Sequence, residues 1–385
     1  MIHFQLDFTT GTLAGEKPLE VFENLSPAEL KKVYKKIKNP SQRLVGYLSY
    51  EWGAALEGIE PACANDALDL PQSWFGLYEI ETIKNAGPVR FGTHPPTRIR
   101  SEGIRPKPAT RIFQSSFSKK KYFQAIKKIL DYLRAGDCYQ VNLSQRFETA
   151  TQETAWEIYQ RLKTISPAPY SAFLDCGPFQ ILSASPELFL EARADGTLIT
   201  KPIKGTRPRG KMAEEDAKLK EELQTSPKDK AELLMITDLE RNDLGKICSP
   251  GSVKVTQLQN IETFAQLHHL VSTIEGQRRA DKDIIDCLIA LMPGGSITGA
   301  PKIRAMEIIK ELEPVNRGVY TGAIGWIGAD NTACFNIAIR TLVIQNQKNY
   351  FSAGGGIVID SDPEKEYEET LTKASGIMKA LTRGF

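Results

Sequence analysis

The chain has 385 residues, of which 41% are hydrophobic and 25% charged, and its formal net charge is +2. This length allows a substantial buried core, and the nearly balanced charge argues against nucleic-acid binding. The N-terminus lacks a basic region followed by an apolar stretch, and no apolar run approaches the length that spans a membrane. Six scattered cysteines without paired spacing fit a reducing compartment. We therefore expect a cytoplasmic protein that binds neither nucleic acid nor membrane.

The first part of the chain reads as short strands with a helix between them. Ser26 is a typical N-cap, and Pro27 and Glu29 suit the first turn of the helix that follows it. Residues 44–52 and 74–80 are predicted to be strands.

The segment 83–110 is rich in proline, glycine and arginine and shows no periodicity, so it predicts a surface connection. It is the best place for a boundary, which divides the chain into an N-terminal segment, 1–112, and a larger region, 113–385. We expect the two to form one integrated globular unit.

The stretch 182–210 predicts a β-hairpin that carries chemistry. Apolar residues alternate with polar ones from 182 to 192, which is the period of a strand buried on one face. Asp195 and Gly196 then suit a two-residue type I′ turn, in which both central positions need positive φ. Counting outward from this turn places Glu187 directly opposite Lys204, so that a carboxylic acid and an amine share one face.

The pair Glu187 and Lys204 has two interpretations at this point. A cross-strand ion pair is the simpler one, and it contributes little stability if it is exposed. The other is a nucleophile and acid pair, because Lys201, Arg207 and Arg209 surround the amine with like charge. Such crowding, with any desolvation, lowers the pKa of a lysine toward the neutral, nucleophilic amine. The hairpin is therefore a candidate catalytic element.

Two predicted helices each carry a pair of acids three residues apart. In the first, Asp229 and Glu232 fall on the stripe expected to face inward, where a carboxylate needs a cation or strong donors. Pairing with Arg241 or another arginine explains this as well as a metal does. The second helix, close to the C-terminus, presents Glu366 and Glu369 on one face. Together the two pairs predict an oxygen-rich site for Mg²⁺.

The segments between these helices contain further candidates for anion binding. The glycine-rich loop 293–302 leads into a helix, so it is either an anion site built from backbone amides or a plain turn. Adjoining antiparallel strands are predicted over 320–326 and 333–344. Arg340 is the one charge in the apolar run of the second strand and needs an anionic partner, from the core or from a ligand. Three glycines within 352–358 permit close approach of a ligand to the backbone.

These motifs resemble the chorismate-utilising enzymes, which include aminodeoxychorismate, anthranilate, isochorismate and salicylate synthases. SPELF and PIKGT around the hairpin carry the resemblance, which extends from about Phe117 to the C-terminus and more weakly through GYLSYEWG at 46–53. PIKGT with Lys204, and GGSITGAPK with Ser296, resemble the aminodeoxychorismate synthase component I family more than anthranilate synthase component I, which usually has PIAGT and GTxSGAPK.

The resemblance implies a fold and a set of site residues. Strands and helices do not alternate regularly along the chain, which favours an α+β class over a parallel sheet. The family adds two large antiparallel sheets packed on each other, with helices outside and the active site between the sheets. Carried over by motif, the catalytic residues are Lys204, Glu187 and His269; the substrate-binding residues are Ser296, Tyr320, Arg340, Gly354, Gly355, Gly356 and Lys373; and the Mg²⁺ ligands are Glu232 and Glu369 directly, with Asp229 and Glu366 acting through water.

The resemblance also implies a reaction, the amination of chorismate at C4 by ammonia to give 4-amino-4-deoxychorismate for 4-aminobenzoate and folate synthesis. Gln140 stands where isochorismate- and salicylate-forming relatives carry a lysine that activates water, which argues against water as the nucleophile. No glutamine-hydrolysing domain is visible, so a separate glutamine amidotransferase subunit is the expected partner. The alternatives are anthranilate synthase component I and a non-catalytic chorismate-binding subunit.

Overall fold

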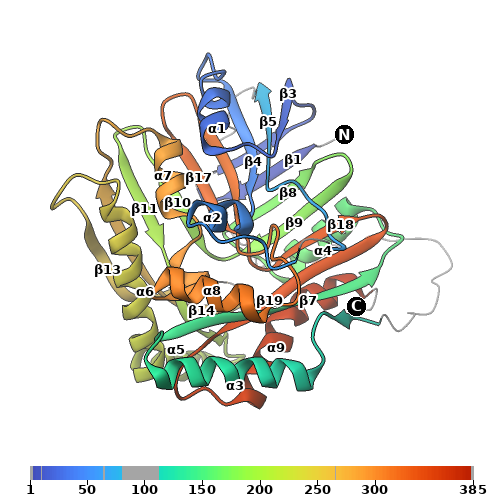
Figure 1. Ribbon diagram of the computed structural model, residues 1–385, viewed down its shortest axis with the longest axis vertical. Helices are drawn as coiled ribbons and strands as arrows, with labels where there is room; N and C mark the ends of the chain where they lie inside the picture. Colours follow the sequence, from blue (N-terminus) through green and yellow to red (C-terminus); the bar gives the residue numbers. More distant parts are fainter. Residues whose placement is uncertain (1–2, 10, 64–65, 80–111, 265, 383–385) are drawn as a thin grey trace.

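The computed structural model describes residues 3–9, 11–63, 66–79, 112–264 and 266–382 of the chain (Figure 1). Within these residues two antiparallel β-sheets form the centre of the molecule. The first sheet has nine strands, in the spatial order β15 (Gly299–Ala300), β7 (Gln140–Ala150), β19 (Lys348–Ile357), β18 (Thr341–Gln345), β9 (Phe179–Ser185), β8 (Tyr170–Asp175), β1 (Phe4–Phe8) and β2 (Gly11–Gly15), with β6 (Gln114–Ser115) beside β7. The second has ten, in the order β12 (Ile203–Pro208), β14 (Leu267–Gln277), β11 (Thr197–Lys201), β10 (Leu188–Ala192), β17 (Ala333–Ile337), β16 (Ala323–Gly328), β4 (Gln42–Leu48), β5 (Ser73–Glu79) and β3 (Glu20–Glu23), with β13 (Lys254–Thr263) beside β14.

The two sheets pack face to face through apolar side chains from both. Phe4 of β1 meets Tyr78 of β5 with ring centroids 4.5 Å apart, and Tyr47 of β4 meets Phe179 of β9 at 6.2 Å. All four rings belong to one buried cluster, which removes a large apolar area from water. The predicted α+β class with two packed antiparallel sheets is thus confirmed.

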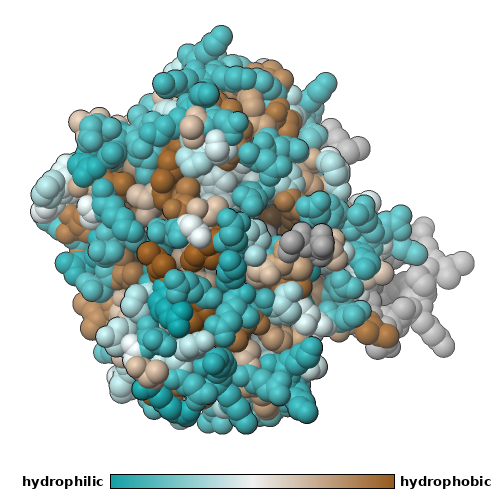
Figure 2. Space-filling model, viewed as in Figure 1, coloured by the Kyte–Doolittle hydropathy of each residue, from teal (hydrophilic) through white to brown (hydrophobic). Residues whose placement is uncertain are grey.

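Helices cover the outer faces of this sandwich. Helices α3, α4 and α9 pack against the first sheet, and α5 and α6 pack against β12 and β14 of the second. Their bounds and those of the other helices are α1 (Pro27–Tyr34), α2 (Tyr50–Leu56), α3 (Lys119–Ala135), α4 (Ala155–Ile165), α5 (Ala213–Thr225), α6 (Pro227–Gly245), α7 (Ile284–Leu291), α8 (Lys302–Leu312) and α9 (Pro363–Leu381), with a short 3₁₀ helix η1 (Gly295–Ile297). On the face shown in Figure 2, apolar side chains gather near the middle and polar ones surround them.

The N-terminal strands complete both sheets. β1 pairs with β8 of the first sheet, and β4 pairs with β16 of the second. The strand predicted over 44–52 is too long, because Ser49 caps α2 by accepting a hydrogen bond from the amide of Trp52 at 3.0 Å. The strand predicted over 74–80 is found as β5. The segment 83–110 lies outside the described residues, so the boundary near 112 stays a prediction.

Two of the connections that pass between the sheets are neighbours, β9 to β10 and β17 to β18, and each carries a predicted site residue. Glu187 lies between β9 and β10, and Arg340 lies between β17 and β18 with φ +50°. The two crossings are adjacent, since the amide of Ile337 donates to the carbonyl oxygen of Glu187 at 3.0 Å and that of Ala184 donates to the carbonyl oxygen of Arg340 at 3.1 Å. The crossings bring both site residues to one end of the sandwich.

These crossings correct two predictions. The run 182–192 is not a strand buried on one face, because its polar residues Ser183 and Ser185 are 0% exposed. The run 333–344 is not one strand, and Arg340 lies in the connection rather than within a ladder. Both errors have the same cause. Strands on either side of a crossing are covered on both faces, so the hydropathy of the sequence does not mark the residue at which the chain leaves one sheet for the other.

Candidate active site

The predicted hairpin forms, but its register differs from the prediction. β10 pairs with β11 through Leu188 and Lys201, and a bulge shifts the register along the ladder. Only Gly196 in the connecting turn has positive φ, so the type I′ assignment is wrong. Lys204 lies beyond β11, in β12, where it pairs with β14. It is therefore not the cross-strand partner of Glu187 in a ladder.

A loop from elsewhere in the chain nevertheless unites Glu187 and Lys204. The Lys204 amine donates to the carbonyl oxygen of Ser296 at 3.0 Å. The Glu187 carboxylate accepts from the backbone amide of Ile203 at 3.4 Å and also bonds the Ser296 side chain. Acid and amine therefore meet on one residue of the loop that precedes α8.

The environment moves both groups toward their neutral forms. Burial lowers the pKa of Lys204, the charge of Lys373 lowers it further, and the charge of Glu187 opposes both. Burial raises the pKa of Glu187, which is 5% exposed, while the charge of Lys204 and hydrogen bonds from Ser296 and Ile203 oppose the rise. Desolvation is the largest cause in each case. Desolvation thus shifts the two pKa values in the direction of a protonated acid and a neutral amine.

The cations predicted to crowd the Lys204 amine are not the ones that lower its pKa, since burial and then the charge of Lys373 have that effect. Each of the three residues expected to surround the Lys204 amine is paired with a carboxylate: Lys201 with Glu262 at 3.0 Å, Arg207 with Glu222 at 2.9 Å and Asp229 at 3.2 Å, and Arg209 with Asp216 at 2.8 Å. Along a strand, successive side chains point to opposite faces, so nearness in sequence did not place these charges near the amine.

The glycine-rich segment is a folded loop with a helix after it, as predicted. It contains η1 and the short strand β15 and leads into α8 at Lys302. The Lys302 ammonium bonds the carbonyl oxygen of Pro293 at 2.9 Å and the carboxylate of Asp243. The amide of Gly295 donates to Glu240 at 3.1 Å. The loop is thus fixed at its start and near its middle.

Arg340, His269 and Tyr320 lie around the crossing between β17 and β18. The charge of Arg340 helps burial to lower the pKa of His269 to about 3, so this imidazole is neutral at physiological pH. Its Nδ1 lies 2.8 Å from the hydroxyl of Thr206. His268 points elsewhere and bonds Asp216 of α5 at 3.0 Å. His269 is therefore the histidine of the pair that lies near Arg340.

Tyr320 precedes β16 in a turn rather than within the strand predicted over 320–326. Thr321 has φ +62°, which is not an extended conformation, so the strand begins only after it, at Ala323. The amide of Thr321 donates to the carbonyl oxygen of Ala338 at 2.9 Å. This bond holds the turn against the crossing that carries Arg340. Burial of Tyr320 raises the pKa of its phenol, which stays a hydrogen-bond donor.

Arg340 has no acid to neutralise it among residues 3–9, 11–63, 66–79, 112–264 and 266–382. It is largely buried, and desolvation alone lowers its pKa. A core ion pair is therefore not its role within the described part of the chain. A guanidinium held in this way is a ready partner for the carboxylate of a ligand.

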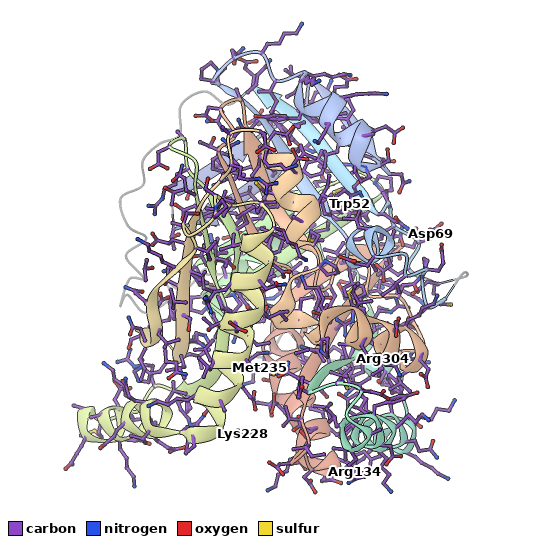
Figure 3. All side chains as sticks on the ribbon, turned by 60° about the vertical axis from the view of Figure 1, so that its left-hand side comes forward. Trp52, Asp69, Arg134, Lys228, Met235 and Arg304 are labelled. Atoms are coloured by element: carbon purple, nitrogen blue, oxygen red, sulfur yellow. The ribbon has the colours of Figure 1, made fainter. Side chains whose placement is uncertain are left out.

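The four predicted metal-binding acids come from α6 and α9. Lys228 and Met235 mark the first part of α6 in Figure 3. Glu366 and Glu369 of α9 converge on Gly355, where an added Cβ would lie 3.4 Å from an oxygen of each. The charges of Asp229 and Glu369 help burial to raise the pKa of Glu232, so the two helices present their acids to one region.

These acids are partly neutralised by protein cations. The Lys373 ammonium lies 2.6 Å from Glu369 and donates to the carbonyl oxygen of Gly354 at 3.0 Å. Asp229 pairs with Arg207, as reported above, while Arg241 pairs with Asp238 at 2.8 Å and is not the partner of either α6 acid. No three His, Cys, Asp or Glu side chains of the described ranges already converge as metal ligands. The donor set, carboxylates that repel one another, is nevertheless chemically suited to Mg²⁺.

The three glycines of β19 let other groups approach closely. An added Cβ at Gly354 would lie 2.6 Å from the carbonyl oxygen of Leu143, and one at Gly356 would lie 2.9 Å from the side chain of Gln140. Gln140 is 0% exposed, and its amide has no hydrogen-bond partner in the described structure. The Gln140 side chain therefore lies beside these glycines.

Arg317 is a residue that sequence reasoning missed. Its guanidinium is bound to Glu313 at 2.8 Å and donates to the carbonyl oxygens of Ile297 and Asn142 at 2.9 and 2.7 Å. It thereby ties the glycine-rich loop to β7 just before the turn that carries Tyr320. The sequence around Arg317, three residues before Tyr320, contains no motif or periodicity that predicts this role.

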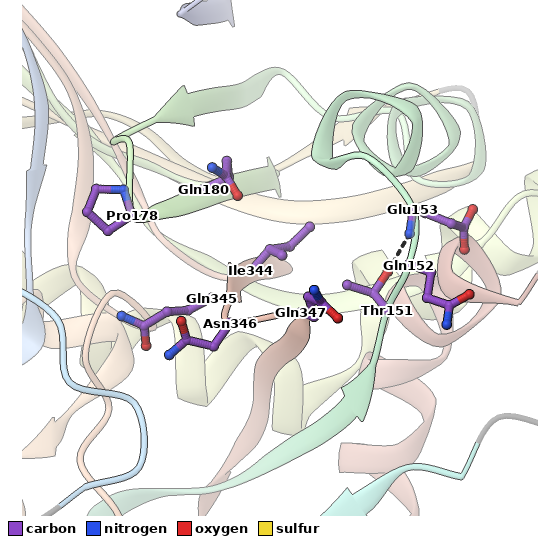
Figure 4. Close-up of a pocket in the computed structure, with 9 residues that line it drawn as sticks. All are labelled: Thr151, Gln152, Glu153, Pro178, Gln180, Ile344, Gln345, Asn346 and Gln347. Atoms are coloured by element: carbon purple, nitrogen blue, oxygen red, sulfur yellow. Dashed lines mark hydrogen bonds between the residues drawn. The ribbon is translucent and has the colours of Figure 1, made fainter.

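A pocket of about 360 Å³ lies outside this site, around the turn between β18 and β19 (Figure 4). Thr151, Glu153, Gln180 and Gln347 are among the residues that line it. Its carboxylate, Glu153, bonds Arg161 of α4, and the pocket contains none of the predicted site residues. It offers no acid and base pair and is not the candidate active site.

The fold and the site together define the class of protein. A family described as chorismate binding enzyme matches residues 4–379, and the chain belongs to this family. Aminodeoxychorismate synthase component 1 of Bacillus subtilis is 43% identical over 361 residues, which cover 88% of this chain and 76% of that protein. Anthranilate synthase component 1 of Thermus thermophilus is 38% identical in an alignment 408 residues long, which covers 98% of this chain and 86% of that protein.

A solved structure supports the same assignment. Anthranilate synthase component I from Streptococcus pneumoniae matches with a TM-score of 0.78 and 30% identity, covering 98% of this chain and 90% of that one. The family resemblance seen in the motifs is thus confirmed. In the described ranges, none of the helices combines the length and the apolar character needed to cross a membrane.

Proposed function

We propose that this chain aminates chorismate at C4 with ammonia and forms 4-amino-4-deoxychorismate, the precursor of 4-aminobenzoate and folate. The observation that carries the proposal is the pair Lys204 and Glu187, whose pKa values burial moves toward a neutral amine and a protonated acid. The similarity to Bacillus subtilis aminodeoxychorismate synthase component 1 over 88% of the chain supports the same reaction.

The proposed chemistry uses these two residues in sequence. The neutral Lys204 amine adds to C2 of the ring, the ring double bonds shift, and the C4 hydroxyl leaves as water with a proton from Glu187. Ammonia then adds at C4, the double bonds shift back, Lys204 leaves C2 as the neutral amine, and the ammonium formed at C4 returns one proton to the Glu187 carboxylate. One ammonia is consumed and one water formed, and the enolpyruvyl ether is retained.

The remaining site residues hold the substrate dianion in this proposal. Arg340 and Tyr320 bind the enolpyruvyl carboxylate, because the guanidinium lacks an acid partner in the described structure and the phenol stays protonated. His269, neutral and under the influence of the Arg340 charge, would contact the substrate in the same region. Ser296, Lys373 and the backbone of Gly354, Gly355 and Gly356 complete the pocket.

Mg²⁺ is the proposed cofactor. Glu232 and Glu369 would hold it directly, and Asp229 and Glu366 would act through bound water. When bound, the ion supplies positive charge that neutralises the ring carboxylate of the substrate. Glu369 and Asp229 would then exchange part of their pairing with Lys373 and Arg207 for the ion.

A glutamine amidotransferase subunit is the proposed partner and the source of ammonia. The relative in Bacillus subtilis is named component 1, which implies a second component in that enzyme. We place the complex in the cytoplasm, where the six free thiols of this chain remain reduced.

Anthranilate synthesis is the second candidate, favoured by the similarity to the Thermus thermophilus enzyme over 98% of the chain. In that reaction ammonia attacks C2 and pyruvate is eliminated. The deciding experiment supplies purified protein with chorismate, ammonium and Mg²⁺ and identifies the product by mass spectrometry and anthranilate fluorescence. A product that keeps its pyruvyl group supports amination at C4. Anthranilate with free pyruvate contradicts it, and substrate binding without turnover at high ammonium would indicate a non-catalytic subunit.

A further inference from the structure

Helix α6 carries two buried carboxylates, Glu240 and Asp243, that the proposed reaction does not use, and Asp243 is already paired with Lys302. Glu240 lies eight residues after Glu232 and on the same side of the helix, because side chains four apart recur on one face. It is 4% exposed. A carboxylate buried to this degree requires donors or a cation.

The donors come from the loop that holds the candidate catalytic pair. The Glu240 carboxylate accepts the backbone amide of Gly295 at 3.1 Å and a backbone hydrogen bond from Ser296. An added Cβ at Gly295 would lie 2.6 Å from a methyl carbon of Leu239 and 3.2 Å from the Glu240 carboxylate. A larger residue at 295 would therefore require the Leu239 side chain to shift.

The charges around Glu240 come from α6 itself and from two other segments. Asp243 follows it on α6, Lys302 faces it from α8, and Glu187 faces it from the crossing between the sheets. Burial, helped by the charges of Asp243 and Glu187 and opposed by that of Lys302, raises the pKa of Glu240 to about 7. The carboxylate is held in place by the two amides and is poorly solvated.

The loop residue that Glu240 binds is also the one that contacts the catalytic pair. The carbonyl oxygen of Ser296 accepts from Lys204 at 3.0 Å, and its side chain bonds Glu187. We propose that Glu240 is a positioning residue, which fixes the amides of Gly295 and Ser296 and thereby sets the location of the Lys204 amine relative to the Glu187 carboxyl group. The inference rests on the proposed function for the roles of Lys204 and Glu187, and its geometry is independent of which product forms.

The test compares Glu240→Leu, Glu240→Gln and the matched surface control Asp238→Asn, whose residue is 75% exposed on the same helix. Initial rates of chorismate consumption give kcat and KM whatever the product is. We expect Glu240→Leu to lower kcat by about 10–100-fold and to change KM less, since Ser296 is the one substrate-binding residue on the loop that Glu240 contacts, and Arg340, Tyr320 and Lys373 lie elsewhere. Glu240→Gln keeps one acceptor oxygen and should recover most of kcat, while Asp238→Asn should match the wild type.

A second readout separates positioning from a general loss of structure. Hydrogen exchange should accelerate at the amides of 295 and 296 in Glu240→Leu, with exchange in the core strands unchanged. Gly295→Ala adds a methyl group between the loop and Leu239 of α6 and should also lower kcat. This variant keeps the test informative even if Glu240→Leu does not fold. Wild-type kcat in Glu240→Leu, or equal losses in the Asp238→Asn control, would overturn the inference. The identity of the product in the same assay reports separately on the proposed function.

Discussion

The amine of Lys204 donates to the carbonyl oxygen of Ser296 at 3.0 Å, across 92 residues of sequence. A neutral amine that donates one N–H to this acceptor has its lone pair held in a defined direction. The bond therefore orients the candidate nucleophile as well as contacting it. The acid at Glu187 is fixed by the same loop residue, so one loop sets the geometry of both groups.

Replacing Lys204 tests its role as nucleophile. Lys204→Ala should lower kcat at least about 10³-fold, because no other amine occupies its place. Lys201→Ala is the matched control, because Lys201 lies three residues before Lys204 and is paired with Glu262. This variant should lose less than about threefold in kcat. Steady-state chorismate consumption measures both. Similar losses in the two variants would remove Lys204 from the mechanism.

Arg340 should affect stability and activity in opposite directions. Arg340→Met removes a largely buried charge without an acid partner in the described structure, so the free energy of unfolding should rise by about 1–3 kcal/mol. The same change should lower kcat/KM by about 10²-fold, because a substrate carboxylate loses its partner.

Urea unfolding and kinetics of Arg340→Met give the two numbers, and Arg241→Met on the exposed side of α6 is the control. The prediction fails if Arg340→Met lowers the free energy of unfolding.

Mg²⁺ should stabilise the folded chain through the acids of α6 and α9. At a concentration of 100 times its Kd, the ion should add about 2.7 kcal/mol to the free energy of unfolding. Glu232→Gln and Glu369→Gln should each abolish most of this gain, whereas Glu368→Gln, exposed on the same helix, should keep it. Thermal unfolding with and without EDTA measures the effect, and an equal gain in all three variants would place the ion elsewhere.

His269 should make the protein sensitive to acid. Its pKa is about 3 in the folded chain and near 6.5 when exposed, so between these values the unfolded chain binds more protons and stability falls as pH falls. The contribution reaches about 1.4 kcal/mol per pH unit. In His269→Gln this slope should be missing when urea unfolding is compared at pH 7, 6 and 5. Parallel pH dependence in the variant and the wild type would contradict the assignment.

Local sequence patterns were reliable where the neighbouring residues alone fix the structure. Ser26 caps α1 as predicted, and Asp229 and Glu232 lie on the half-buried side of α6, whereas Asp238 is exposed. The sequence also predicts an apolar stripe on α9 formed by Tyr367, Leu371, Ala374, Met378 and Leu381. This was less accurate, since Glu366 and Thr370 are buried more deeply than Tyr367. Helical periodicity gives the face to within about one residue, and the packing of α9 on β19 and on neighbouring helices decides the rest.

The sequence alone determined the family, the antiparallel sandwich and the identity of most candidate site residues, because motifs, caps and charge patterns are local properties of the chain. Only the tertiary structure decided that Glu187 and Lys204 meet through Ser296, that Arg340 stands at a crossing between sheets, and that Glu240 supports the loop. These relationships join residues far apart in the chain. They depend on strand register and on which sheet each strand enters. A strand that is covered on both faces has no polar face to indicate either of these in its sequence.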